Sequence, residues 1–445
     1  MNAFSRRGAC PALSAPMQTG DGLLVRLNPV SGGLSPRLLI ELAEAALRHG
    51  NGIMEVTARG SMQIRGLSME SAALLAAEVD ALGIAVRTGV PVETGPLAGI
   101  DPREIADPRP MAERIRMGIE ETGLAIRLGP KVAVVVDGGG QLTLDAVTAD
   151  VRLAATRTDV GIQWRVSVAG DGQTAKPLAV ADEDAARDIA VAALRMVAEK
   201  GREAHTRDLS RRQLESLAGW HSTAPPSVLP EGDAVERFHS PIGDFSLGKG
   251  HALGIGLAYG SMPADKIIGL AQKALALGAT EIRLVPGRAL LFLGQPVVAS
   301  RSLQTIAATL GFVTSPADPR TRIAACPGTP ACASGRIATR DIAEAIAAEN
   351  ADILDFTLHV SGCAKGCAHP GPAALTIVGG ENGAGLVVNA TAKALPAGYR
   401  PGYDAAHGIS RVAAMIRSAR FQGETAAACL TRLGPAGIAE TYKQE

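Results

Sequence analysis

The sequence predicts an α+β protein built from two related halves, and three observations favour this fold class. The chain has 445 residues, more than one core usually spans, because single cores rarely grow past about 250 to 300 residues. Hydrophobic residues make up 47% of the chain and charged residues 20%, which is typical of folded proteins. A shift of 228 positions superposes helix and strand patterns without a gap over more than 30 residues.

The first copy of this repeat begins with a helix and continues with a strand. Ser35 and Pro36 are typical of a helix start, apolar residues follow at helical spacing, and Gly50 closes the helix. A strand is expected from Ile53 to Val56, and a further apolar stretch ends at Gly66. Together these elements make half of an α+β unit.

The second copy has the same elements in the same order. Ser261 and Pro263 precede the helix, and Gly278 closes it. A strand is expected from Glu281 to Val285, followed by an apolar stretch that ends at Gly294. We therefore expect a tandem duplication, in which each short leading unit is followed by a longer segment.

The predicted divisions follow from this duplication and from a linker rich in proline that has no hydrophobic period. They are an N-terminal arm (1–20), a leading unit (21–90), a long segment (91–218), the linker (219–240), a second leading unit (241–317) and a second long segment (318–445).

Two glycine-rich segments are predicted to be hairpin turns. Residues 131–136 read as a strand, residues 138–140 are three glycines, and residues 141–144 are expected to form the returning strand. A phosphate-binding loop should open a helix, and this one opens a strand. The same interpretation applies to Gly248-Lys249-Gly250, which lacks Walker spacing.

Charge and composition exclude several classes of partner. Lys and Arg number 44, as do Asp and Glu, so no net field favours nucleic acid or an anionic membrane. Aromatic residues are only 3% of the chain, too few for a platform that stacks single-stranded bases. No run of about 18 apolar residues occurs, and the first residues do not form a signal peptide. We expect a protein of the reducing cytoplasm.

Four of the six cysteines lie within 42 residues and predict a metal site. Cys326 and Cys332 form a C-x5-C pair, and Cys363 and Cys367 form a C-x3-C pair. The first spacing is too wide for a zinc knuckle, whereas four thiolates from two loops suit an iron-sulfur cubane. Structural zinc and unrelated buried thiols are the alternatives.

Local sequence around these cysteines favours the cluster. Gly362 and Gly366 allow close backbone approach. Helical spacing through Ile337 and Ile342 is expected to place Cys332 near a helix N-terminus, where the dipole favours anionic sulfur. The solitary Cys10 and Cys429 are interpreted as ordinary small residues.

These features together resemble the sulfite and nitrite reductase superfamily. The resemblance rests on the cysteine spacing, the repeat and the segment Thr57-Ala58-Arg59-Gly60-Ser61-Met62-Gln63-Ile64-Arg65-Gly66. Within the superfamily, three separated strings are most similar to the branch of the aerobic cobalamin pathway whose substrate is precorrin-3A. They are Arg7-Gly8-Ala9-Cys10-Pro11 leading to Thr19-Gly20-Asp21-Gly22-Leu23, then Pro96-Leu97-Ala98-Gly99-Ile100-Asp101, and Gly362-Cys363-Ala364-Lys365-Gly366-Cys367-Ala368-His369-Pro370.

The resemblance implies a pseudo-twofold fold and a cofactor. The two leading units would pair as ferredoxin-like half-domains, and the two long segments would form the α/β walls of a tetrapyrrole cleft. The four cysteines would bind a 4Fe-4S cluster, and Cys367 occupies the position whose thiolate bridges to sirohaem iron in the reductases. Arg59 and Lys131 match basic residues of the family, but Ala133 replaces a second lysine, which puts sulfite reduction in doubt.

The resemblance also implies a monooxygenase. It would use O2 and two reducing equivalents to hydroxylate precorrin-3A at C20 and close a lactone with the ring A acetate. NADH would be the ultimate electron source. Because no Rossmann fingerprint or flavin site is visible, we expect a separate reductase as partner. The alternatives are a sirohaem-dependent sulfite or nitrite reductase and a noncatalytic iron-sulfur carrier.

Recognition of a polycarboxylate substrate should use guanidinium and ammonium groups. The catalytic candidates are Arg59, Lys131 and Lys365, and the further substrate-binding candidates are Arg65, Arg152 and Arg288. His369 could ligate a mononuclear iron or bond a cluster sulfide, whereas His359 is expected to be a partly buried strand histidine. Asp137 and Asp150 lie near the expected cleft wall, and no pairing in the sequence gives either an acid-base role.

Overall fold

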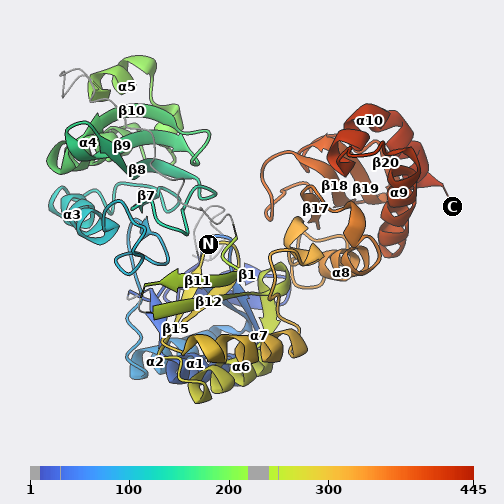
Figure 1. Cartoon of the computed structure of the whole chain (residues 1–445), viewed down its shortest axis with the longest axis horizontal. Coiled ribbons are helices and arrows are strands. Elements are labelled where there is room, and N and C mark those ends of the chain that lie inside the picture. The colour runs from blue at the N-terminus through green and yellow to red at the C-terminus, as the bar shows by residue number, and fades with distance from the viewer. Residues whose placement is uncertain (1–10, 31, 219–239, 249, 445) are drawn as a thin grey trace.

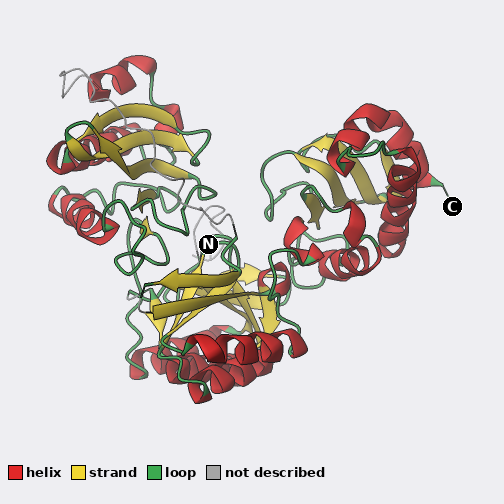
Figure 2. Ribbon diagram, viewed as in Figure 1, coloured by secondary structure: helices red, strands yellow, loops and turns green. Residues whose placement is uncertain are grey.

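Three parts can be distinguished in the computed structural model: a central layer and two lobes that stand on it (Figure 1). The structure describes residues 11–30, 32–218, 240–248 and 250–444. Cys10, the first half of the predicted arm and almost all of the predicted linker lie outside these residues. Figure 2 shows the helices of the central layer on the face of its sheets that points away from the lobes.

The central layer holds two five-stranded sheets with the same strand order. The first runs β1 (Met17–Thr19), β2 (Gly22–Leu27), β5 (Met62–Leu67), β4 (Ile53–Val56) and β13 (Ser261–Pro263). The second runs β11 (Gly243–Leu247), β12 (Gly250–Gly256), β15 (Ala289–Leu293), β14 (Glu281–Val285) and β3 (Gly33–Leu34). The helices are α1 (Pro36–His49), α2 (Met69–Ala81), α6 (Ala264–Ala276) and α7 (Val297–Thr309).

The two copies of the repeat exchange a strand. β13 belongs to the second copy but pairs with β4 of the first, and β3 of the first copy pairs with β14 of the second. Each sheet is therefore completed by the other copy, so the two halves form one layer. The predicted repeat is confirmed, and the predicted strands Ile53–Val56 and Glu281–Val285 match β4 and β14.

The helix starts follow the predicted chemistry. The Ser35 side chain accepts a hydrogen bond from the Leu38 N–H at 3.2 Å, and Pro36 is the first helical residue of α1. The apolar face of α1 includes Leu39 and Leu42, which are fully buried. α6 begins directly after Pro263.

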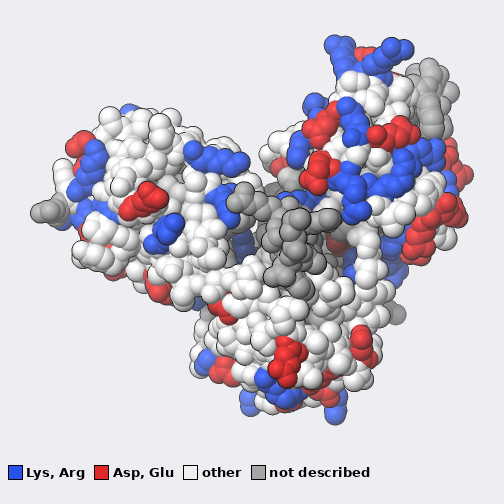
Figure 3. All heavy atoms as spheres, turned by 180° about the vertical axis from the view of Figure 1, so that it is seen from behind, with Lys and Arg blue, Asp and Glu red and all other residues white. Residues whose placement is uncertain are grey.

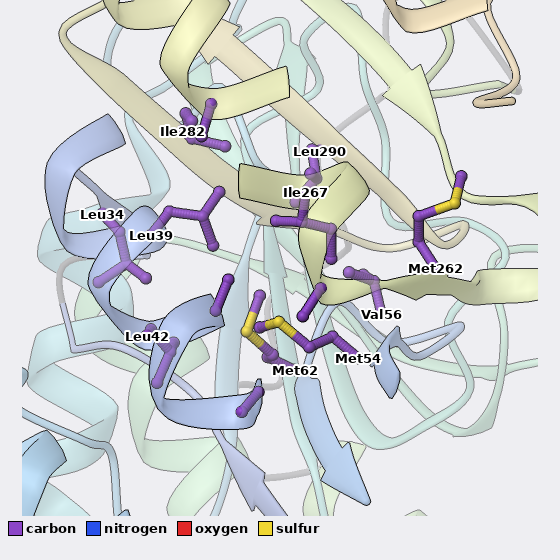
Figure 4. Close-up of a cluster of buried hydrophobic side chains, with 14 of the residues drawn as sticks. Leu34, Leu39, Leu42, Met54, Val56, Met62, Met262, Ile267, Ile282 and Leu290 are labelled. Carbon is purple, nitrogen blue, oxygen red and sulfur yellow. The ribbon is translucent and has the colours of Figure 1, made fainter. Parts of the chain in front are cut away.

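Side chains from both copies fill one continuous core between the sheets and helices of the central layer. Figure 4 shows six of them from the first copy beside four from the second. They are Leu34, Leu39, Leu42, Met54, Val56 and Met62, with Met262, Ile267, Ile282 and Leu290. Because the core is shared, neither half would bury its apolar face alone.

Each lobe contains a five-stranded sheet covered by three helices. Lobe 1 has β6 (Val92–Thr94), β7 (Val134–Asp137), β8 (Ala149–Thr158), β9 (Gly161–Gly170), β10 (Lys176–Ala181), α3 (Pro108–Glu121), α4 (Glu183–Lys200) and α5 (Arg211–Ala218). Lobe 2 has β16 (Ile323–Ala325), β17 (Leu358–Ser361), β18 (Ala373–Gly380), β19 (Gly383–Ala390), β20 (Gly398–Arg400), α8 (Thr339–Glu349), α9 (Ala405–Ala419) and α10 (Ala426–Lys443). In both, the first three strands are parallel and the others antiparallel.

The prediction of a hairpin at residues 138–140 is wrong. β7 begins at Val134, and residues 141–144 form no strand. β7 has β6 on one side and β8 on the other, both parallel to it. Since both of its edges are already paired, no room remains for a returning strand. The second glycine-rich segment does join two antiparallel strands, β11 and β12, although Lys249 lies outside the described residues.

The predicted position of Cys332 near a helix N-terminus is also wrong. α8 begins at Thr339, seven residues further along the chain. The residues between them close a loop, in which the Gly335 N–H donates to the Cys332 carbonyl at 2.8 Å. Apolar spacing alone did not reveal this loop, because Ile337 is buried before the helix starts.

No helix in the described part of the chain is long and apolar enough to cross a lipid bilayer.

Candidate functional site

The four clustered cysteines lie in two loops at one edge of the lobe 2 sheet. Cys326 follows β16 directly, and Cys363 lies two residues after the end of β17. β16 and β17 are parallel neighbours. The carboxyl ends of parallel strands meet at the same edge, where binding sites of such sheets are usually found. The fold thus brings together the pairs that the sequence separates by thirty residues.

Glycine lets these two loops touch through their backbones. A Cβ atom at Gly362 would lie 3.1 Å from the Gly328 Cα and 3.2 Å from the Gly335 Cα, closer than side-chain atoms usually pack. The Arg336 N–H donates to the Gly362 carbonyl at 2.8 Å, which joins the loops further. Gly362 is therefore required for the close approach of the cysteine pairs.

The four cysteines are free thiols, and Cys367 lies close enough to the other three for their charges to affect it. The Gly362 N–H donates to the Cys326 Sγ at 3.2 Å. Burial raises the pKa of Cys367, and so do the charges of Cys326, Cys363 and Cys332. Cys367 is the most exposed of the four, whereas Cys429 is buried in the core of lobe 2.

This donor set fits an iron-sulfur cluster better than a single ion. Among the described residues, no three His, Cys, Asp or Glu side chains converge closely enough to hold one metal ion. In a cubane each thiolate binds a different iron, so the four sulfurs stand further apart than ligands of a single ion. Soft thiolates from two loops, with a backbone N–H directed at sulfur, are typical of such clusters.

A buried histidine lies beneath the second cysteine loop. His359 is fully buried in β17, and neither ring nitrogen has a hydrogen-bond partner among the described residues. Burial, with smaller contributions from the charges of His369 and Arg288, lowers the pKa of His359 to about 4. The ring centroids of His359 and His369 are 5.8 Å apart, in an edge-to-face arrangement.

Lys365 and Arg288, both from the predicted set, contact the cysteine loops. The Lys365 Nζ donates to the Ser334 Oγ at 2.7 Å, which links the second loop to the first. The Arg288 Nη2 donates to the Ala368 carbonyl at 3.2 Å. Arg288 is half-buried. This burial lowers the pKa of its guanidinium, with a smaller contribution from the charge of Arg340.

Arg59 and Arg288 come from corresponding turns of the two copies. The β4–β5 and β14–β15 turns pack together through a bridge between Arg59 and Pro286. The Arg59 Nη2 donates to the Thr148 carbonyl at 2.8 Å and to its hydroxyl at 3.0 Å. One arginine of each turn thus contacts the lobe that follows that turn in the chain.

Arg59 and the segment of Lys131 meet at the start of β8. Thr148, which Arg59 contacts, lies two residues before Asp150. The Ala133 N–H donates to the Asp150 carboxylate at 3.2 Å, and the exposed Lys131 is two residues earlier. The residue that Arg59 contacts and the backbone two residues after Lys131 thus both lie near the start of β8.

Asp150 has a partner that the sequence did not reveal. The His205 Nδ1 lies 3.0 Å from an Asp150 carboxylate oxygen, and the Thr206 N–H donates to the same oxygen at 3.0 Å. His205 is 55 residues away in the chain, so no local pattern indicated the pair. Asp137, by contrast, is buried and accepts backbone hydrogen bonds from Gly139 and Leu144.

Arg65 and Arg152 are buried, and both donate hydrogen bonds to protein atoms. Arg65 forms ion pairs with Asp21 at 3.0 Å and Glu55 at 3.3 Å, and donates to the Ala331 carbonyl at 2.6 Å. It therefore connects Asp21, at the start of the first leading unit, to the first cysteine loop. Arg152 donates to two backbone carbonyls of the loop before β8, at 2.7 and 2.8 Å.

A pocket of about 600 Å³ lies between the central layer and lobe 1, within the usual volume of ligand sites. Its lining contains Arg59, Arg87, Arg109, Arg116 and Arg283, with Glu93, Asp107 and Glu113. Arg59 is the guanidinium of this lining that forms no ion pair with a carboxylate in the described part of the chain. The other four each pair with one, at 2.7 to 3.1 Å. Within the described residues, the Arg59 charge is therefore not neutralised by a carboxylate, although its Nη2 donates to Thr148.

The surface charge is mixed. The face in Figure 3 shows Lys and Arg interspersed with Asp and Glu over all three parts of the molecule. This pattern agrees with equal numbers of basic and acidic residues in the whole chain, 44 of each. Any recognition of a polyanion must therefore use local groups such as those described above.

Comparisons with known proteins agree with this architecture. The profile of the nitrite/sulfite reductase ferredoxin-like half domain matches residues 15–82. The structure of the Mycobacterium tuberculosis NirA protein has a TM-score of 0.71, at 18% identity, over 94% of this chain and 84% of that one. A precorrin-3B synthase from Sinorhizobium sp is 40% identical over 444 residues, covering 99% of this chain and 96% of that protein.

The duplicated central layer with its two lobes defines a protein of the nitrite and sulfite reductase fold, and the predicted fold class is confirmed. At 18% identity, the NirA likeness describes the fold alone. The full-length similarity at 40% identity goes further: the chain belongs to the precorrin-3B synthase family.

Proposed function

We propose that this chain catalyses the synthesis of precorrin-3B from precorrin-3A. The observation that carries the proposal is the 40% identity to a precorrin-3B synthase along 99% of the chain. In the proposed reaction, one atom of O2 enters the substrate as the hydroxyl at C20 and the other leaves as water. Two electrons, supplied ultimately by NADH, balance this step, and the ring A acetate closes a lactone.

The four cysteines Cys326, Cys332, Cys363 and Cys367 are the proposed ligands of a 4Fe-4S cluster. The donor set and the backbone N–H aimed at the Cys326 sulfur support this assignment. When bound, the cluster would supply one-electron transfer to an adjacent iron centre, either sirohaem or a mononuclear iron. Cys367, the most exposed thiol, is the proposed link to that centre.

The substrate carboxylates are proposed to bind Arg59, Lys131 and Lys365. Three observations support this proposal: Arg59 contacts Thr148 just before β8, Lys131 precedes a segment hydrogen-bonded to Asp150 of β8, and Lys365 lies on the loop between Cys363 and Cys367. A guanidinium without a carboxylate partner binds an incoming carboxylate in a bidentate manner. These groups would hold the macrocycle and neutralise its charge.

The other three predicted arginines are less exposed than Arg59. Arg65, Arg152 and Arg288 were predicted as substrate contacts, but Arg65 and Arg152 are buried, and all three donate hydrogen bonds to protein atoms. We assign them the role of positioning the loops around the site. A separate reductase is the proposed electron donor, and the reducing cytoplasm is the proposed location, in keeping with five free thiols in the described residues.

Isotope labelling tests the reaction. Purified protein with its cluster, precorrin-3A, an electron donor and 18O2 should give a product with one labelled oxygen, whereas H2 18O with ordinary O2 should leave the new hydroxyl unlabelled. Product without label from 18O2 would overturn the monooxygenase assignment. Full turnover with NADH alone would contradict the separate reductase.

A sirohaem-dependent reductase of sulfite or nitrite is the second candidate, and the likeness to the NirA fold favours it. The alanine at position 133, in place of a lysine that would polarise the oxyanion, opposes it. The absorption spectrum of anaerobically purified protein separates the two. A sirohaem spectrum with sulfite-dependent turnover would favour the reductase, and a 4Fe-4S spectrum without sirohaem would favour the synthase.

A further inference from the structure

His359 is a buried polar side chain with unused hydrogen-bonding capacity. The ring has no exposed surface, and in the described part of the chain neither nitrogen has a partner. A buried polar group left unpaired destabilises the folded protein by about 1 to 3 kcal/mol. An apolar side chain in β17 would avoid this cost, so the histidine needs another explanation.

The polar edge of the ring is directed at the second cysteine loop. A Cβ atom built at Gly366, the residue before Cys367, would lie 3.7 Å from the His359 Cε1. Cε1 is the atom between the two ring nitrogens, so both nitrogens lie on this side of the ring. Leu358 and Val360 point to the opposite face, where they join the core beneath the helices of lobe 2.

Nearby protein groups do not satisfy the ring. His369, the neighbouring imidazole, uses its Nε2 to contact the Pro372 carbonyl at 3.1 Å. Ser361, on the same face of β17, donates to the Cys363 carbonyl at 2.7 Å. A neutral imidazole carries one N–H donor, and a thiolate or sulfide held by this loop is an acceptor for such a donor.

We propose that the His359 imidazole donates a hydrogen bond to a sulfur of the cluster held by the four cysteines, either the Cys367 thiolate or a bridging sulfide. This inference rests on the proposed cluster. Its consequence concerns the redox potential. A hydrogen bond to sulfur stabilises the reduced cluster, which carries one more negative charge, and so raises the reduction potential.

Two substitutions separate this role from a structural one. His359→Leu fills a similar space without a donor, whereas His359→Gln retains an N–H. In the reconstituted protein, an EPR-monitored redox titration should show a lower potential for His359→Leu. We expect about a tenfold change in the one-electron equilibrium, which corresponds to about 59 mV. His359→Gln should recover part of this shift.

In the cluster-free protein, His359→Leu should not lower the thermal stability. Without the cluster, His359→Leu removes two unpaired polar atoms from a buried position, so its melting temperature should equal or exceed that of the parent protein. A clear loss of stability in this state would indicate a structural partner for His359 and overturn the proposal.

A spectroscopic measurement on the unmodified protein provides a second test. Pulsed EPR of the reduced cluster, with 15N-labelled histidine, should detect a weak nitrogen coupling that His359→Leu abolishes. An unchanged potential in His359→Leu with a full cluster, or the absence of this coupling, would overturn the proposal. If the unmodified protein assembles no 4Fe-4S cluster at all, the proposed function fails instead. A changed KM at constant potential would assign His359 to the substrate and not to the cluster.

Discussion

The two lobes share one strand order, yet corresponding loops serve different purposes. Cys332 lies seven residues after the end of β16 in lobe 2, and Asp101 lies seven residues after the end of β6 in lobe 1. The loops after β17 and β7 also correspond, and they carry Cys363 and Gln141 respectively. The difference lies in how the polar side chains of these loops are satisfied.

In lobe 1 the two loops are hydrogen-bonded to each other. The Asp101 carboxylate accepts from the Gln141 backbone N–H at 2.5 Å and from its side-chain amide at 2.9 Å. In lobe 2 the thiols have few donors, and His359 has none of its hydrogen bonds formed within the described residues. Duplication provides two equivalent pairs of loops, of which one forms hydrogen bonds within lobe 1 and the other carries the proposed cluster ligands.

Of the changes that test this difference between the lobes, removing a cysteine should have the largest effect on activity. Cys363→Ala should abolish the cluster and lower activity at least 100-fold, because the cofactor carries the redox chemistry. Iron and acid-labile sulfide per chain measure the loss. Cys429→Ala, in the buried core of the same lobe, should keep the cluster at a cost of about 1 kcal/mol in unfolding free energy. A complete cluster in Cys363→Ala would refute the assignment of this ligand.

The second test concerns the hydrogen-bonded loops of lobe 1. Asp101→Ala leaves the Gln141 and Arg103 backbone N–H groups unpaired and removes one of the two acceptors of the Gln141 side-chain amide, so the unfolding free energy should fall by about 2 to 4 kcal/mol. Urea unfolding measures this change, with the exposed Asp159→Ala as control, for which we expect less than 0.5 kcal/mol. The cluster content should be unchanged. Loss of the cluster in Asp101→Ala would show that the two pairs of loops are not independent.

Arg59 should affect substrate binding and leave folding almost unchanged. Arg59→Gln removes an exposed guanidinium whose partners are the Thr148 carbonyl and hydroxyl. We expect KM for precorrin-3A to rise about tenfold, as for the loss of one charge-assisted hydrogen bond, with the melting temperature unchanged. Arg157→Gln, on the exposed face of β8, serves as control. An unaltered KM in Arg59→Gln would remove Arg59 from the substrate site.

The smallest expected effect is a pH dependence in lobe 1. Burial raises the pKa of Glu104 to about 7, with smaller contributions from the charges of Asp101 and Asp107. Protonated Glu104 therefore favours the fold below its ordinary pKa of 4.5, and this stability is lost as the pH rises toward 7. Glu104→Gln should melt about 2 °C higher than the parent protein at pH 8 and at the same temperature at pH 4. An equal difference at both pH values would exclude titration of Glu104 as the cause.

The repeat could be predicted because it is a local pattern, and the clustering of four cysteines in the chain is a local pattern too. Ser35 caps its helix, Ile53–Val56 forms a strand, and a fixed shift along the chain relates the two copies. The expected hairpin at residues 138–140 failed for a tertiary reason. A glycine run indicates a turn, but the partner of the preceding strand depends on which strands flank it in the sheet.

The sequence by itself determined that the chain is duplicated, that its core is apolar and that four cysteines lie close enough in the chain to share a site. These properties depend on spacing and residue type alone. Only the tertiary structure decided that β3 and β13 are exchanged, that Asp150 pairs with His205 and that His359 is buried without a partner. Each of these depends on distances between residues far apart in the chain, which are set by packing and not by local pattern.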